Sequence, residues 1–146
     1  MSETADRLAA LLNTIPPKLT DFSDAHASEK PAGGRWSKKE ILGHLIDSAA
    51  NNHQRFVRAQ FATHLDIAGY QQEQWVSAQH YAGEPWTELV NLWLLLNRHL
   101  VHIIQRVPAD CLPHTVSIAG RDPVTLEFVI DDYLRHLEHH LGQILH

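Results

Sequence analysis

The sequence predicts an all-α fold, a four-helix bundle whose helices are joined by long connections. Four segments carry apolar residues at helical spacing, and no repeated alternation of apolar and polar residues indicates a strand. The 146 residues fit one domain spanning 1–146. A content of 44% hydrophobic and 20% charged residues is typical of a globular protein with a buried core.

The first helix is predicted over residues 4–14. Its apolar stripe consists of Leu8, Leu11, Leu12 and Ile15. Pro16-Pro17 is expected to end the helix, because proline lacks the amide donor that a helix interior needs. Residues 18–35 show no strong period and contain a Pro-Ala-Gly-Gly run, so we expect a long connection there.

The second helix has the clearest start in the sequence. Ser37 and Glu40 have the spacing of a capping box, and Trp36 just before them can pack against Ile41. Apolar residues recur at helical spacing from Ile41 onward, and the helix is predicted to continue to about Thr63. Residues 64–84 are polar, rich in glutamine and irregular, with room for short helical turns.

Two further helices complete the bundle. Pro85 suits the first turn of a third helix, which is predicted to run to about Val107 and is apolar nearly all round. Its surplus of Trp and Leu predicts a homodimer. Residues 108–124 are predicted to form a loop with an extended piece at 115–118. Thr125 then caps a fourth helix that continues through Ile144.

The composition argues against several classes of protein. A net charge of −5 argues against nucleic-acid binding, which needs a basic surface. Cys111 is the only cysteine, which excludes an internal disulfide framework and makes the cytoplasm the expected compartment. We expect no secretory signal and no membrane span, because the longest apolar run, residues 92–96, is too short to cross a bilayer.

Three histidines are candidates for a metal site. His136 and His140 are four residues apart and therefore share one face of the fourth helix, close to its apolar stripe, whereas His139 points away. His44 on the second helix is the candidate for a third ligand. Three neutral imidazoles without a thiolate favour zinc or nickel with a position left open for water or substrate. The alternative is that the pair on the fourth helix is merely solvated.

A polar stripe on the second helix accompanies His44. Ser48, Asn51 and Arg55 follow it in steps of four, three and four residues, and Asp47 lies one step outside. These residues predict a polar pocket at one end of the bundle, with Asp47 as an orienter of a metal ligand. The alternative is a solvent-exposed flank.

Asn97 falls within the most apolar stripe of the third helix. A buried amide needs hydrogen-bond partners, since leaving one unpaired costs roughly 1–3 kcal/mol. Asn97 is therefore a candidate to orient a metal ligand or to touch substrate, and the alternative is a structural bridge between helices.

Two motifs together resemble a known family. The first is Trp36-Ser-x-x-Glu-Ile-Leu-Gly-His44-Leu-Ile-Asp47-Ser48 with Asn51 and Arg55, and the second is Tyr133-x-x-His136-x-x-His139-His140-x-x-Gln-Ile144. They resemble the DinB superfamily, most closely its YfiT-like metal-dependent hydrolases. The resemblance implies a four-helix bundle in which His44, His136 and His140 bind a divalent metal, often nickel or zinc. It also implies thiol transfer as an activity of some members.

The sequence therefore predicts a divalent-metal-binding, DinB-like hydrolase with a three-histidine site and a small-molecule substrate. One alternative is a metal-dependent thiol S-transferase, which turns over an electrophile only when a thiol is supplied. Another is a non-catalytic stress protein that binds metal or a small ligand. No general base emerges from the sequence, so no catalytic residue beyond the metal ligands is assigned.

Overall fold

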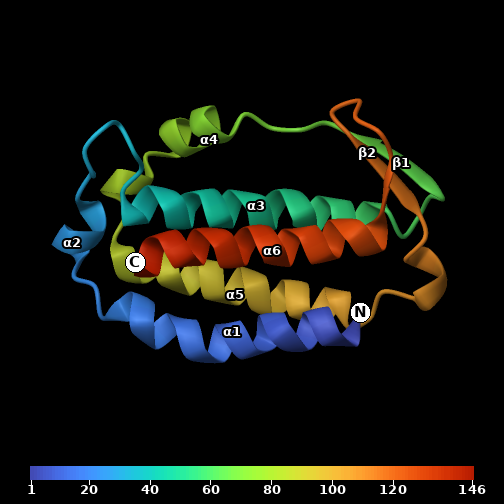
Figure 1. The fold of residues 1–146 in the computed structure, drawn as a ribbon, viewed down its shortest axis with the longest axis horizontal. Coiled ribbons are helices and arrows are strands. Elements are labelled where there is room, and N and C mark those ends of the chain that lie inside the picture. The colour runs from blue at the N-terminus through green and yellow to red at the C-terminus, as the bar shows by residue number, and fades with distance from the viewer.

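Long helices lying side by side form the body of the computed structural model, which describes residues 1–146. They are α1 (Ser2–Thr20), α3 (Lys38–Arg58), α5 (Trp86–Ile104) and α6 (Leu126–Leu145) (Figure 1). α3 packs against α5 and α6, and α1 packs against the same two helices. The predicted four-helix bundle is confirmed, with a small sheet added at one end.

The direction of the helices explains the longest connection. α3 and α5 run in the same direction, and α1 and α6 run in the opposite one (Figure 1). Because neighbouring α3 and α5 are parallel, the chain must return along the length of the bundle between them. Residues 59–85 make this return and include three short elements, which are β1 (His64–Ile67), α4 (Gln72–Gln79) and the 3-10 turn η1 (Tyr81–Gly83).

A three-stranded sheet of order β1-β2-β3 closes the end of the bundle at which α3 ends and α6 begins (Figure 1). β1 pairs in parallel with β2 (Thr115–Ile118), and β2 pairs antiparallel with β3 (Val124–Thr125). The extended piece expected at 115–118 is confirmed. The irregular stretch expected at 64–84 is confirmed in part, since α4 and η1 are short helical elements, whereas β1 was not expected. β1 has only four residues, which is too short for a periodic signal.

The end expected for the first helix is wrong. α1 continues beyond the predicted 4–14 and passes through Pro16-Pro17, although each proline in a helix interior costs about 3 kcal/mol relative to alanine. Packing holds the extension in place, because Ile15 and Leu19 are both buried in the core. In addition, the Leu19 carbonyl accepts a hydrogen bond of 2.7 Å from Trp86 Nε1. Tertiary contacts thus outweigh the local stop signal.

The capping box expected at the start of α3 is confirmed. Ser37 Oγ accepts a hydrogen bond from the Glu40 amide, and the Glu40 carboxylate accepts one from the Ser37 amide. α3 ends at Arg58, short of the predicted Thr63. Phe61, just beyond that end, is 84% exposed.

The other helix ends agree more closely with the sequence. Pro85 directly precedes α5, which ends at Ile104 rather than at the predicted Val107. Thr125 caps α6 as expected, since its Oγ1 accepts a hydrogen bond of 3.1 Å from the Phe128 amide. Two short elements lie in the other connections, α2 (Asp24–Ser28) before α3 and the 3-10 turn η2 (Ala109–Cys111) after α5.

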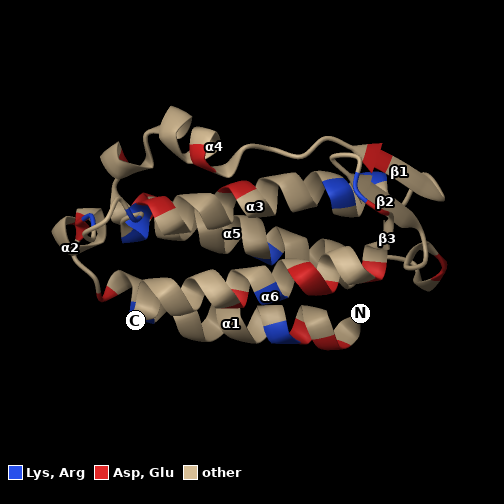
Figure 2. Cartoon of the chain, turned by 45° about the horizontal axis from the view of Figure 1, so that its top comes forward, with Lys and Arg blue, Asp and Glu red and all other residues tan.

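The core lies between the four helices and includes Trp86, Trp93 and Phe56. α5 is less enclosed than its composition predicted, because Leu92 and Leu95 on its outer face are exposed. Acidic and basic residues alternate along the helices in Figure 2, and no basic face is visible in that view. None of the helices combines the length and the apolarity that a membrane span requires.

Candidate metal centre

The antiparallel contact between α3 and α6 brings three histidines together. His44 comes from α3 and is fully buried, whereas His136 and His140 come from α6 and are partly buried. Their ligand atoms lie within 4.8 Å of one another. His139 is exposed and lies outside this group. These are the three residues that the helical spacing singled out.

The spacing of the ring nitrogens fits a metal ion. His44 Nε2 and His136 Nε2 are 3.1 Å apart. Two nitrogens bound to one tetrahedral zinc at about 2.05 Å lie about 3.3 Å apart, so this pair has nearly the separation that shared ligation requires. The donor set is all imidazole and contains no thiolate or carboxylate, which suits a divalent transition metal.

The surroundings keep these imidazoles neutral. Burial, together with the neighbouring His136 and His140 rings, lowers the pKa of His44 from 6.5 to about 4. Burial and the His140 ring likewise lower the pKa of His136 to about 4. The pKa of His140 is also lowered, chiefly by burial, while its hydrogen bond with Gln143 opposes that shift. Neutral imidazole is the form that binds metal, so the cluster is ready for ligation at neutral pH.

The Nδ1 atoms of the three histidines differ in their hydrogen-bond partners. His140 Nδ1 forms a hydrogen bond of 2.8 Å with Gln143 Oε1, which fixes its ring and leaves Nε2 free to bind metal. The Nδ1 atoms of His44 and His136 are buried and have no hydrogen-bond partner. The Trp36 ring lies 5.1 Å from the His44 ring, centroid to centroid, and helps to enclose that side of the cluster.

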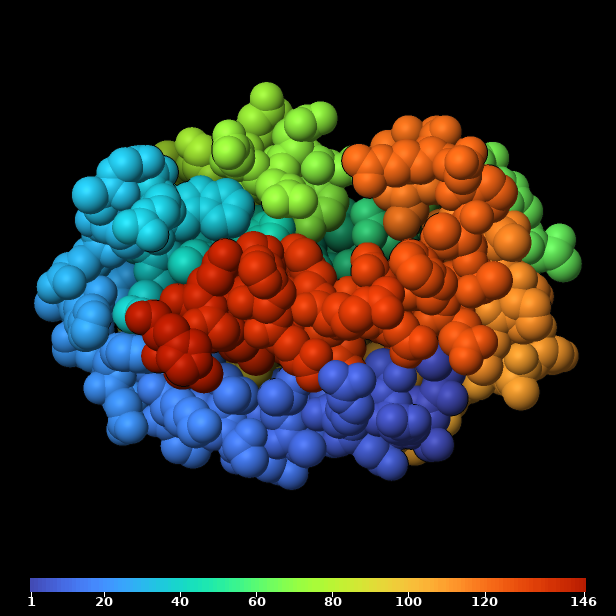
Figure 3. All heavy atoms as spheres, in the orientation of Figure 1, coloured from blue at the N-terminus to red at the C-terminus, as the bar shows by residue number.

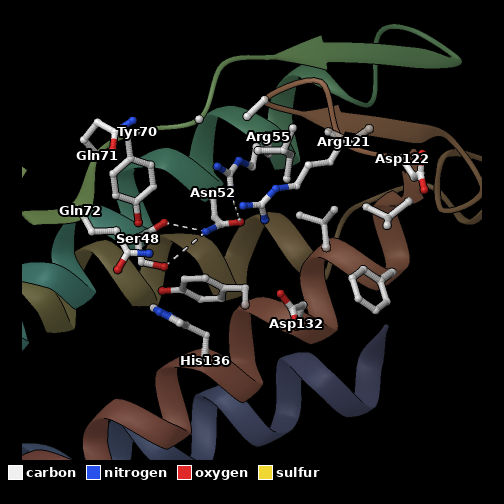
Figure 4. A pocket seen from close by; sticks show the side chains of 18 residues that line it. Ser48, Asn52, Arg55, Tyr70, Gln71, Gln72, Arg121, Asp122, Asp132 and His136 are labelled. Atoms are coloured by element: carbon white, nitrogen blue, oxygen red, sulfur yellow. Dashed lines mark hydrogen bonds between the residues drawn. The ribbon is translucent and has the colours of Figure 1, made fainter.

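A pocket of about 590 Å³ opens beside the histidines, and His136 forms part of its wall. In Figure 3 the surface is hollowed between the green segment around residue 70, the orange segment around residue 120 and the orange-red α6. The lining combines α3, the residues after β1, the sheet and α6 (Figure 4). The volume suits a small organic molecule.

The polar stripe of α3 faces this pocket in part. Ser48 and Arg55 of the predicted stripe line it, together with the buried Asn52, which the stripe did not include. Asn52 donates a hydrogen bond of 2.8 Å to the Ser48 carbonyl (Figure 4). Asn51 is outside the lining and donates to the Asp47 carbonyl instead. Spacing could have found Asn52, since it is eight residues after His44.

Asp47 lies on another side of α3. Its Oδ1 accepts hydrogen bonds from Tyr81 of η1, at 2.6 Å, and from Gln79, at 2.8 Å. No hydrogen bond joins Asp47 to a histidine. Gly43 permits this arrangement, because a Cβ added there would lie 2.2 Å from the Tyr81 ring. In this structure Asp47 ties the return connection to α3.

Asn97 forms a bridge between helices. It is fully buried on α5, its Nδ2 donates a hydrogen bond of 2.9 Å to the Trp93 carbonyl, and its Oδ1 accepts one from the Tyr133 hydroxyl of α6. It does not line the pocket, but Tyr133 does. Asn97 therefore positions a residue of the pocket wall and corresponds to the bridging alternative of the sequence analysis.

Most of the pocket lining was missed by sequence reasoning, including Tyr70, Arg121 and Tyr133. Tyr70 and Arg121 lie in the connections after β1 and β2, where no period predicts which way a side chain faces. Tyr133 lies on the buried face of α6 and also borders the pocket.

Comparison with known proteins agrees with this architecture. The chain is similar to YfiT from Bacillus subtilis, a probable metal-dependent hydrolase with an unusual four-helix bundle topology. The TM-score is 0.83 at 19% sequence identity, and the match covers 99% of this chain and 85% of that chain, which establishes a shared fold. No curated protein matches the sequence. The model of the DinB superfamily matches residues 1–144, and the protein therefore belongs to the DinB superfamily.

Proposed function

We propose that the protein is a metal-dependent hydrolase that holds a divalent ion with His44, His136 and His140. The observation that carries the proposal is a cluster of three imidazoles with ligand atoms within 4.8 Å, one of which borders a pocket of about 590 Å³. The similarity to YfiT, itself described as a probable metal-dependent hydrolase, supports the same class of reaction.

The metal would be zinc or nickel, given three neutral nitrogen donors. Bound there, it would make a water molecule or a thiol more acidic and a substrate carbonyl more electrophilic. The protein supplies the rest. Gln143 fixes the His140 ring through Nδ1, and Trp36 and the bundle core shield His44 from solvent. Ser48 lies in the pocket wall, where its hydroxyl group can orient a substrate (Figure 4).

Metal content tests the centre directly. We expect about one zinc or nickel ion per chain by mass spectrometry in the wild type. His44→Ala, His136→Ala and His140→Ala should each lose it. His139→Ala is the matched control on the same helix and should keep it, because His139 is exposed and outside the cluster. Wild-type protein that binds no metal after reconstitution would overturn the proposal.

Turnover then separates the reactions that such a centre supports. A hydrolase cleaves activated esters or amides without added thiol, and the rate depends on metal and on His136. Turnover of an electrophile only in the presence of a low-molecular-weight thiol would assign transfer instead. Tight metal binding without turnover in either assay would favour a non-catalytic role.

A further inference from the structure

Arg55 lies in the pocket wall with its charge uncompensated. The residue is half-buried on α3, and its Nε atom is fully buried without a hydrogen-bond partner. Its one hydrogen bond runs from an Nη atom to Asn52 Oδ1 and is long, at 3.4 Å. A guanidinium offers five donors, so most of this group's capacity is unused.

No carboxylate neutralises this guanidinium. Other arginines of the chain form ion pairs, such as Arg7 with Glu138 at 2.8 Å, but no Asp or Glu oxygen lies within 4.0 Å of Arg55. Burial lowers the pKa of Arg55 from its ordinary value, yet arginine stays protonated in proteins. The buried Nε has lost contact with water without gaining a partner, and an anion entering the pocket would supply the missing acceptor.

A second guanidinium enters the pocket from the opposite wall. Arg121, in the turn between β2 and β3, points toward Asn52 in the view of Figure 4 and also has no carboxylate partner. Two acidic residues, Asp122 and Asp132, lie in the same lining. Asp132 pairs with Arg135 at 3.3 Å, whereas Asp122 has no ion pair. These acids favour an anion of single charge over a dianion such as a phosphate monoester.

The rest of the pocket suits an apolar body. Val116, Ile118, Val129 and the Tyr70 ring contribute to its wall. Arg55 is eleven residues after His44 on α3, which places their backbones about 16 Å apart along the helix axis. Arg55 and His136 line the same pocket, so a molecule lying along α3 contacts both.

We propose that the pocket binds small organic carboxylates, with the carboxylate on Arg55, assisted by Arg121, and the apolar body between Tyr70 and Val129. The far end of the molecule then points toward His136. The orientation of the far end toward His136 rests on the proposed hydrolase function, whereas the carboxylate site itself does not need the metal.

Calorimetric titration of the full-length chain without metal tests the carboxylate site. Metal is removed with a chelator because a bound cation would itself attract anions. The probes are 3-phenylpropionate, its neutral amide 3-phenylpropionamide, and phenyl phosphate. We expect the acid to bind at least tenfold more tightly than the amide and more tightly than the phosphate. Arg55→Gln should abolish the preference for the acid, and Arg55→Lys should retain part of it.

Arg58→Gln is the matched control. It makes the same substitution one turn further along α3, at an exposed arginine that only contacts Gln54, and should keep the full preference. Amide NMR shifts in the wild type locate the acid independently of any variant. We expect them at residues 48–55, 69–72 and 118–122.

Three results would overturn the inference: equal binding of acid and amide, a preference that survives Arg55→Gln, or shifts confined to other parts of the surface. Tighter binding of phenyl phosphate would overturn the assignment to carboxylates. Failure of the hydrolase proposal is seen separately, as absence of metal in the reconstituted wild type. The two proposals can therefore fail independently.

Discussion

Two buried polar clusters lie within the same bundle and differ in how far their hydrogen bonds are completed. Between α5 and α6, Asn97 donates to the Trp93 carbonyl and accepts from Tyr133, so both side chains have partners inside the protein. Between α3 and α6, by contrast, the Nδ1 atoms of His44 and His136 are buried without partners.

The difference distinguishes polar groups that stabilise the fold from polar groups that are left available for a ligand. Each buried polar atom left unpaired costs about 1–3 kcal/mol, so a cluster with several of them opposes folding unless a ligand completes it. The Asn97–Tyr133 pair has no such deficit and holds two helices together. Substitutions in the Asn97–Tyr133 pair should therefore lower stability, whereas substitutions in the histidine cluster should weaken ligand binding.

The largest expected effect is on metal binding. His136→Gln removes one of three ligands and should weaken zinc binding by at least about 100-fold, since even residues that only orient ligands change affinity by 10–100-fold. The unfolding free energy of the metal-free protein should change by less than about 1 kcal/mol, because one unpaired imidazole is replaced by an amide. Competition with a chromogenic chelator measures the affinity, and urea denaturation measures the stability.

The second largest expected effect is that of an Asn97 substitution, which should change the stability of the protein without changing metal binding. Asn97→Ala should lower the unfolding free energy by about 3 kcal/mol, because it leaves the Tyr133 hydroxyl unpaired and opens a small cavity. Zinc affinity should be unchanged once the protein is folded. A variant that keeps full stability but loses zinc would show that Asn97 belongs to the metal centre and would remove the contrast between the clusters.

The clusters should also differ in their response to acid. The pKa of His44 is about 4 in the folded chain and about 6.5 when unfolded, so the unfolded chain binds more protons between these values. His44 alone should therefore lower the stability of the metal-free protein by about 2–3 kcal/mol as the pH falls from 6.5 to 4, and His136, whose pKa is also lowered to about 4, adds to the loss. Above pH 6.5 both states are neutral and this contribution is flat. Urea denaturation across this range measures the slope.

His44→Gln is the control for that slope and should reduce it, because glutamine does not titrate. Tyr133, in the other cluster, contributes nothing in this window, since burial raises its pKa. A slope that is the same in wild type and His44→Gln would assign the acid sensitivity to other groups.

The sequence could predict the residues that one helix period places together. His136 and His140 share a face because they are four residues apart, and Ser48 and Arg55 follow His44 on the adjoining stripe. The meeting of α3 with α6 needed the family resemblance, since no local pattern fixes which helices become neighbours. The helix caps at Ser37 and Thr125 could be predicted from the sequence because a cap depends only on nearby residues.

The parts that the sequence did not predict depend on distant contacts. Tyr70 reaches the pocket from the connection that the parallel arrangement of α3 and α5 requires, and Arg121 reaches it from the turn between β2 and β3. α1 passes through Pro16-Pro17 because Leu19 packs in the core and accepts a hydrogen bond from Trp86. In each case an interaction across the fold outweighs the local signal.

The hydrogen bonding of Asp47 is intermediate between that of the two clusters, and its substitution should change stability the least. Its Oδ1 accepts hydrogen bonds from Tyr81 and Gln79, like an atom of the structural pair, but its Oδ2 is buried without a partner. Burial raises the pKa of Asp47, although the hydrogen bonds from Tyr81 and Gln79 oppose that shift. A raised pKa in the folded state means that the ionised carboxylate is less stable there than in the unfolded chain.

Asp47→Asn should therefore leave the unfolding free energy at pH 7 unchanged or raise it by up to about 1 kcal/mol. Asparagine keeps an oxygen for the Tyr81 hydroxyl and removes the charge that burial disfavours. Metal content should stay at the wild-type level, because no hydrogen bond links Asp47 to the histidines. A tenfold loss of zinc affinity at unchanged stability would instead place Asp47 among the groups that orient the metal ligands, as its spacing from His44 first predicted.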